Sequence, residues 1–74
     1  MERNVVINIK DLLAKYNISL RELSRRTDIR HAALNELANN EREFVYLNHL
    51  KKIADALDID DMNEIIYFES SNRE

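Results

Sequence analysis

The chain has 74 residues and a formal net charge of −3, with no Cys, no Gly and no Pro. A chain of this length forms one domain and buries only about 60% of the surface that its unfolded form exposes. The lack of Cys excludes disulfides and thiolate metal sites, and the lack of a long apolar run or a signal peptide favours a cytoplasmic location with no membrane partner.

The amino-terminal segment from Asn4 to Ile9 is rich in β-branched residues, which predicts a short strand. A first helix is expected to follow, with Asn8 as its cap and Asn17 at its end. Its inner face carries Ile9, Leu12, Leu13 and Tyr16.

Two short helices joined by a tight turn are predicted between Ser19 and Asn39, at about residues 20–26 and 31–37. Apolar and small residues recur there at helical spacing: Leu20, Leu23 and Thr27, then Ala33, Leu34 and Leu37. Ser19 and Glu22 have the spacing of a capping box. Asp28 stands where the turn needs a left-handed backbone, a conformation that Asp tolerates better than most residues.

The carboxyl-terminal half begins with a polar loop in which Phe44 is expected to pack inward. A fourth helix is predicted over residues 47–57, and Asp60 could cap a last short turn. The run from Ile65 to Phe68 reads as a second strand, which could pair with residues 5–9. The domain would then span residues 1–69, with residues 70–74 as a frayed tail.

The expected fold is all-α, a compact bundle of four to five helices with a helix-turn-helix, to which the termini could add two strands. The predicted core comprises Leu13, Leu23, Leu34, Leu37, Leu50, Ile53 and Leu57.

Apolar and small residues keep a specific spacing over roughly residues 9–65: Leu12-Leu13, Ile18-Ser19, the run from Arg21 to Thr27, Ile29, Ala32, Leu34, Leu37, Asn39, Leu47, Leu50, Ile53-Ala54, Ala56-Leu57 and Ile59. This pattern resembles the Cro/repressor-type helix-turn-helix family of bacterial and phage transcriptional regulators, of the xenobiotic-response-element class. The resemblance implies sequence-specific binding of double-stranded DNA, with the second motif helix in the major groove.

The chain departs from that family at several positions. Leu20 replaces a common Gln, and Asp28 and Asn40 replace Gly. Glu36 and Glu41 stand near positions that are frequently Arg or Lys in the family, so they add negative charge where DNA would lie.

The candidate DNA-binding residues are Arg21, Arg25, Arg30, His31, Ala32, Asn35, Glu36, Asn39 and Arg42. The arginines around the motif, Arg26 included, are candidates for phosphate contacts, which position a reading helix. On that helix, Asn can pair with adenine, Glu can accept from cytosine, and Ala can touch the thymine methyl group.

The distribution of charge supports two functions of different class. Residues 10–52 carry nine Lys or Arg against six Asp or Glu, whereas residues 53–74 carry one Arg against seven acids. The basic half favours DNA, since phosphate contacts dominate DNA affinity. The acidic total, Leu20, Glu36 and Glu41 favour a domain that binds a larger regulatory protein, as an antirepressor or modulator.

A homodimer through the terminal strands or the last helices is an alternative to simple core packing for Tyr67 and Phe68. No cofactor, metal or enzymatic activity is expected. His31 and His49 lie in separate elements, the acids of residues 58–64 do not fit a calcium loop, and Ser19 and Ser24 have no neighbouring base.

Overall fold

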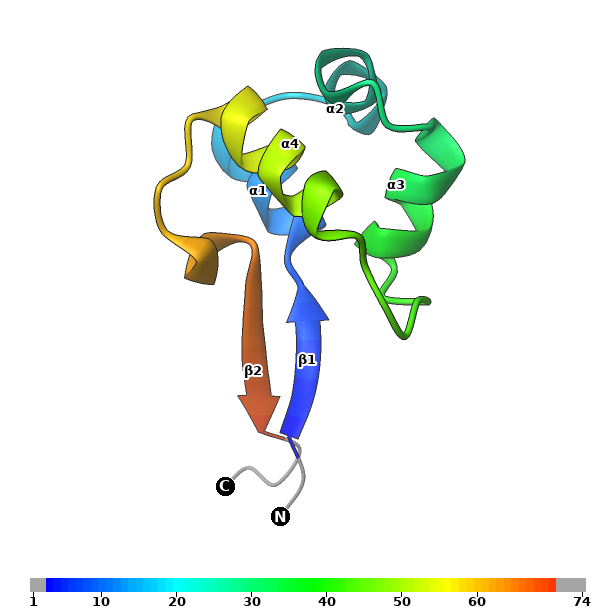
Figure 1. The fold of residues 1–74 in the computed structure, drawn as a ribbon. Coiled ribbons are helices and arrows are strands. Elements are labelled where there is room, and N and C mark those ends of the chain that lie inside the picture. Colours follow the sequence, from blue (N-terminus) through cyan, green and yellow to red (C-terminus); the bar gives the residue numbers. More distant parts are fainter. Residues whose placement is uncertain (1–2, 71–74) are drawn as a thin grey trace.

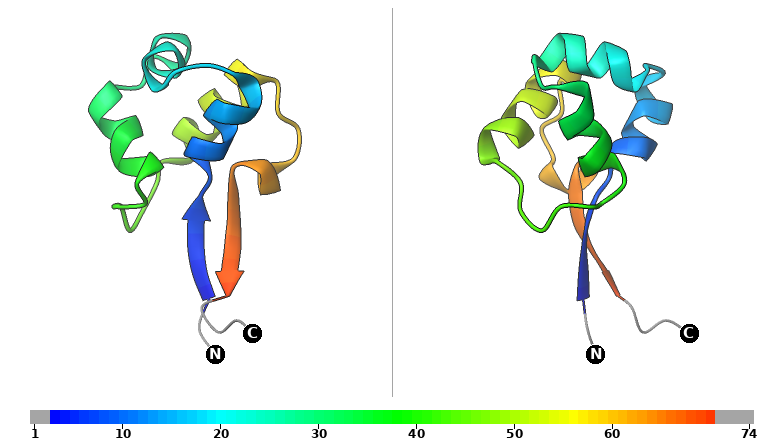
Figure 2. Two further views of the ribbon diagram at one scale, coloured as in Figure 1. Left: turned by 180° about the vertical axis from the view of Figure 1, so that it is seen from behind. Right: turned by 90° about the vertical axis from the view of Figure 1, so that its right-hand side faces the viewer.

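The computed structural model describes residues 3–70. Four α-helices form a compact body, and two strands pair into a ribbon that projects from it (Figures 1 and 2). In chain order the elements are β1 (Arg3–Ile7), α1 (Ile9–Tyr16), α2 (Leu20–Thr27), α3 (His31–Ala38), α4 (Leu47–Leu57), the 3-10 turn η1 (Met62–Glu64) and β2 (Ile66–Ser70). The expectation of an all-α fold is therefore only partly met, because the fifth helical element is a single 3-10 turn and the strands form a regular sheet.

Polar residues end the helices in place of Gly. Asn17, Asp28 and Asp58 adopt left-handed backbones with φ of 55°, 59° and 57° at the ends of α1, α2 and α4. Asn and Asp tolerate this region better than other non-Gly residues. The turn chemistry predicted for Asn17 and Asp28 is thus confirmed.

The predicted caps are only partly correct. Ser19 Oγ accepts a hydrogen bond from the backbone N–H of Glu22 at 3.0 Å, so it caps α2 as predicted. The other half of the predicted capping box is not formed, because the Glu22 carboxylate accepts from Arg25 and Arg26 instead. Asn8 occupies the cap position of α1, but its amide instead donates to the Glu64 carbonyl at 3.2 Å. Asp61, not Asp60, caps η1, because its side chain accepts from the Asn63 N–H.

The core draws buried residues from every α-helix, from the start of the ribbon and from the segment around η1. The largest fully buried side chains are Ile9, Leu12, Leu23, Leu34, Ile53 and Ile65. Six of the seven predicted core residues are buried, and the exception is Leu13, which is half-buried. Leu12, one position earlier on α1, points fully inward instead.

The ribbon pairs antiparallel in a register that places Val5 opposite Phe68 and Ile7 opposite Ile66. The predicted pairing of the two terminal strands is therefore confirmed, but its predicted extent is wrong at one end. Strand β1 runs from Arg3 to Ile7, and Ile9 already belongs to α1, so the strand does not reach residues 8 and 9. Strand β2 extends to Ser70, the first residue of the expected tail, and residues 71–74 lie outside the described residues.

The prediction that Phe44 packs inward is wrong. Its side chain is 65% exposed, whereas the neighbouring Val45 is half-buried and packs against the core. Val45, rather than Phe44, covers the core at this point of the loop.

A separate hydrogen-bond cluster ties η1 to α1. Glu64 Oε1 accepts from Lys15 Nζ at 2.8 Å and from the Tyr16 hydroxyl at 3.1 Å.

Over residues 3–70, no helix has both the length and the apolar character needed to cross a membrane.

Candidate nucleic-acid interface

The turn between α2 and α3 is held by side chains as well as by its backbone. Ser24 Oγ donates to the Ile29 carbonyl at 2.5 Å, and Thr27 Oγ1 accepts from the Ile29 N–H at 3.3 Å. Thr27 is itself buried and donates to the Leu23 carbonyl at 2.7 Å. Together with the left-handed Asp28, these contacts fix the direction in which α3 leaves α2.

Helix α3 has one buried and one exposed face, and it lies at the edge of the helical body (Figure 1). Leu34, Leu37 and Ala38 are buried. The opposite face brings together four of the predicted site residues, which recur at spacings of three and four: Ala32, Asn35, Glu36 and Asn39. His31 is exposed at the first position of the helix, so its side chain lies at the end nearest the turn.

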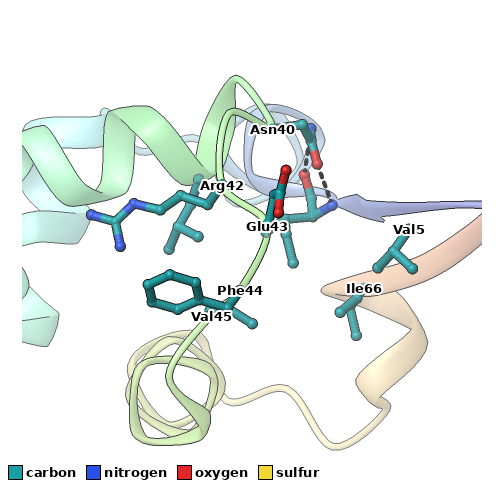
Figure 3. A pocket seen from close by; sticks show the side chains of 9 residues that line it. Val5, Asn40, Arg42, Glu43, Phe44, Val45 and Ile66 are labelled. Atoms are coloured by element: carbon teal, nitrogen blue, oxygen red, sulfur yellow. Dashed lines mark hydrogen bonds between the residues drawn. The ribbon is translucent and has the colours of Figure 1, made fainter.

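Glu36 is paired with Arg42 across the carboxyl-terminal end of α3. Arg42 Nε donates to Glu36 Oε1 at 2.6 Å, and both side chains are partly exposed. Figure 3 shows Arg42 extending from the loop alongside the helix. The negative charge of Glu36 is thus offset by Arg42.

The arginines of α2 divide into paired and unpaired side chains. Glu22 accepts hydrogen bonds from Arg25 and from Arg26, the latter at 2.8 Å. These bonds, first from Arg25 and then from Arg26, lower the pKa of the Glu22 carboxyl to about 2. The same contact raises the pKa of Arg25. Arg25 and Arg26 therefore share one carboxylate and present a reduced positive charge.

Arg21 and Arg30 are exposed, and within residues 3–70 neither takes part in an ion pair. Arg21 is the second residue of α2, and Arg30 immediately precedes α3. One guanidinium group without an ion pair in the described residues therefore stands directly before α3, at Arg30, and a second lies in the first turn of α2, at Arg21.

An aromatic cluster beside Arg42 was not anticipated from the sequence. The Phe44 and Tyr46 rings meet edge to face with centroids 6.2 Å apart, and Tyr46 and His49 do so at 5.0 Å. The Arg42 guanidinium lies 6.0 Å from the centre of the Phe44 ring. Partial burial, followed by the charges of Lys52 and Arg42, lowers the pKa of His49.

The missed contacts lack a local spacing signal. Glu36 and Arg42 are six residues apart and joined across a helix end, where the three- and four-residue rules of a continuous helix do not apply. For the aromatic cluster, the only signal in the sequence was the alternation of Phe44 and Tyr46 next to a charged loop.

In the described part of the chain, no group of three or more His, Cys, Asp or Glu is placed to hold a metal ion.

No match was found among curated proteins or among solved structures. The family model of the Cro/C1-type HTH DNA-binding domain, however, matches residues 8–71, which include the complete helix-turn-helix and its supporting elements. The chain belongs to the Cro/C1-type helix-turn-helix family, whose domains bind DNA and regulate transcription.

Proposed function

We propose that this protein binds double-stranded DNA sequence-specifically and regulates transcription, with α3 inserted in the major groove. The observation that carries the proposal is the exposed outer face of α3, which the hydrogen-bonded turn holds in place. Two exposed arginines of the motif, Arg21 and Arg30, form no ion pair within residues 3–70. A major groove about 12 Å wide admits one α-helix. Side chains on that face would reach the base edges.

The residues divide by role. Arg21 and Arg30 contact phosphates, and Arg25 contributes less because Glu22 shares its charge. Asn35 and Asn39 are the best candidates to read bases, since an Asn amide can both donate to and accept from adenine. Ala32 supplies an apolar contact, and His31 reaches the groove from the first turn.

The net charge of −3 is only a weak argument against DNA binding. Two of the carboxylates nearest the interface, Glu22 and Glu36, are each bound by arginine. The acids of residues 53–74 belong to the part of the chain that follows the motif. Local charge rather than net charge determines phosphate affinity.

The test is a titration of labelled genomic DNA fragments with the full chain at two salt concentrations. Arg30→Ala should weaken binding to every fragment and reduce the salt dependence, because a phosphate contact is lost. Asn35→Ala should instead change which fragments are preferred. Lys51→Ala, which removes one positive charge from the exposed side of α4, is the control and should behave like the wild type.

A protein-binding role, as an antirepressor or modulator, is favoured by one observation. Three of the arginines in or near the motif are engaged by Glu22 or Glu36 and are less available to phosphates: Arg25, Arg26 and Arg42. On this alternative, DNA binding would be negligible even at low ionic strength, and the wild type would capture a larger regulator from its host.

A further inference from the structure

One edge of β1 is open. The Asn8 N–H donates to the Ile65 carbonyl, which fixes the order of the hydrogen bonds between the two strands. In an antiparallel ladder, alternate residues bond to the partner strand, and the residues between them point their backbone groups away from it. The N–H and C=O groups of Arg3, Val5 and Ile7 therefore point away from β2, on the side of β1 where the loop between α3 and α4 lies (Figure 1).

Asn40 occupies the inner end of this edge. Its side-chain amide accepts from the Ile7 N–H and donates to the Ile7 carbonyl. Two bonds exchanged with a single residue are the pattern of an antiparallel neighbour, since a parallel strand divides its bonds between two residues. Next along the edge, the backbone groups of Val5 and Arg3 make no hydrogen bond within residues 3–70. The Asn40 amide therefore stands where an antiparallel third strand would begin, and it leaves the two outer positions free.

A shallow pocket of about 90 Å³ adjoins the open edge, between the ribbon and the loop. Figure 3 shows Phe44 and Val45 on one side of it, and Val5 and Ile66 on the other. A drug-sized ligand needs a cavity of about 300–1,000 Å³, so the pocket suits a single aliphatic side chain instead. Because residues directly opposite each other share a face of a sheet, a residue paired with Val5 would place its side chain over this pocket.

The charges along the edge differ between its two ends. Glu43 lines the pocket, is exposed and takes part in no ion pair within the described residues. Arg42 also lines the pocket, but its charge is offset by Glu36. Arg3 stands exposed at the outer end of β1. A segment that carries a cation at its inner end and an anion at its outer end would therefore be complementary to this edge.

We propose that this edge binds an extended segment of another protein as an antiparallel third strand. An aliphatic residue of the segment lies opposite Val5 and fills the pocket. An Asp or Glu two residues later lies opposite Arg3. A Lys or Arg in the two residues before the aliphatic one lies beside Glu43, where the segment turns away from Asn40.

Strand addition uses main-chain hydrogen bonds for affinity and pockets for alternate side chains for specificity, and this edge offers both. The ribbon also gains the third strand that a two-stranded sheet needs for stability of its own. The edge is formed by β1 rather than by α3, so this inference goes beyond the proposed DNA binding and does not depend on it.

A second copy of this chain fits the edge less well. If two β1 strands paired about Val5, each Arg3 would face Ile7 of the other copy, where the Asn40 amide is already bonded. Only the central pair of hydrogen bonds could then form. A pairing of Val5 with Arg3 of the other copy would place an arginine, in place of an aliphatic side chain, over the pocket.

The test is NMR-detected hydrogen exchange of the full chain with a synthetic peptide, the acetylated and amidated pentapeptide Lys-Lys-Leu-Thr-Glu, at up to about 1 mM. Exchange of the Val5 N–H should slow when peptide is added, because this group acquires an acceptor. The Val6 N–H, which faces β2, should be unchanged and serves as the internal control. Chemical-shift changes along the titration give the dissociation constant.

Two further peptides of the same net charge test the pocket and the direction of the strand. Lys-Lys-Ser-Thr-Glu should bind about tenfold more weakly, because its Ser leaves the pocket without an aliphatic side chain. The reversed peptide Glu-Thr-Leu-Lys-Lys presents its charges in the wrong order for an antiparallel strand and should also bind more weakly. Unchanged affinity of the Ser peptide would overturn the role of the pocket, and unchanged affinity of the reversed peptide would overturn the antiparallel arrangement.

A charge reversal in the protein isolates Glu43. Glu43→Lys should weaken the binding of Lys-Lys-Leu-Thr-Glu severalfold. Asp60→Lys is the matched control, because it makes the same change in net charge at an exposed position between α4 and η1, outside the pocket lining. Equal weakening by both variants would overturn the contact with Glu43. Far-UV circular dichroism should show the same helix content in both variants and in the wild type.

The proposal as a whole is overturned if no peptide slows exchange at Val5. It is also overturned if exchange at Val5 slows with rising protein concentration alone, because the edge then binds a second copy. DNA titration of the same samples separates this proposal from the proposed function: a chain that binds the peptide but no DNA removes DNA binding alone, and a chain that binds DNA but no peptide removes the third strand alone.

Discussion

Asn40 pairs with the backbone of Ile7 as a neighbouring strand would. The Ile7 N–H donates to Asn40 Oδ1 at 2.7 Å, and Asn40 Nδ2 donates to the Ile7 carbonyl at 3.3 Å. Asn40 itself has a left-handed backbone with φ of 57°. One residue therefore turns the chain after α3 and attaches that turn to the ribbon, 33 positions earlier in the sequence.

This double role predicts an order of stabilities. Asn40→Gly keeps the favourable backbone but loses both hydrogen bonds, at about 0.5–1.5 kcal/mol each. Asn40→Ala loses them too and adds a left-handed Ala, so it should be less stable than the Gly variant by about 1 kcal/mol. Urea unfolding measures both. Equal stability of the two variants would contradict the backbone role, and wild-type stability of the Gly variant would contradict the hydrogen bonds.

Local rules predicted the parts of this fold that depend on neighbours in sequence. Ser19 caps α2 and Asp28 ends it, because capping and left-handed turns involve residues within one helical turn. The attachment of Asn40 to Ile7 joins distant segments, and no periodicity announces it. The same limit applies to the site: the outer face of α3 followed from helical spacing, whereas its charge depends on Arg42 in a loop.

The core makes a second prediction. Leu34 is fully buried on α3, so Leu34→Ala should cost about 2–5 kcal/mol by lost transfer energy and the cavity it leaves. That is a large share of the stability of so small a domain. Leu47→Ala removes the same atoms from an exposed position and should change stability by less than about 0.5 kcal/mol. Similar thermal unfolding of both variants would contradict the burial of Leu34.

The Glu22 cluster predicts a dependence of stability on acid pH. The pKa of the Glu22 carboxyl falls from an ordinary 4.5 to about 2 in the folded state, chiefly because Arg25 donates hydrogen bonds to it. A lowered pKa contributes stability above pH 4.5, and that contribution is lost as pH falls from 4.5 toward 2. Glu22→Gln should therefore unfold with a shallower dependence on pH over this interval.

Thermal melts at several pH values measure this slope. Glu64, whose pKa is lowered by hydrogen bonds from Lys15 and then Tyr16, adds to the slope in the same direction. The variant with both Glu22→Gln and Glu64→Gln should consequently show the weakest dependence. Parallel curves for the wild type and Glu22→Gln would show that the ion pairs to Arg25 and Arg26 do not persist in solution.

The ion pair between Glu36 and Arg42 makes the prediction closest to function. Glu36→Gln removes the carboxylate that holds the Arg42 guanidinium at 2.6 Å beside the exposed face of α3. Arg42 can then contact a phosphate. Non-specific DNA affinity should rise, its salt dependence should steepen by about 0.9 in log–log slope for one added phosphate contact, and discrimination between fragments should fall.

Two matched variants separate this effect from a simple change in net charge. Asp55→Asn also removes one negative charge, but on the exposed side of α4, where Asp55 pairs with Lys51. It should leave fragment preference unchanged. Arg42→Gln leaves Glu36 uncompensated beside the DNA and should weaken binding to all fragments. If Glu36→Gln and Asp55→Asn alter affinity and preference equally, the carboxylate acts only through long-range charge, and Glu36 does not control Arg42 at the interface.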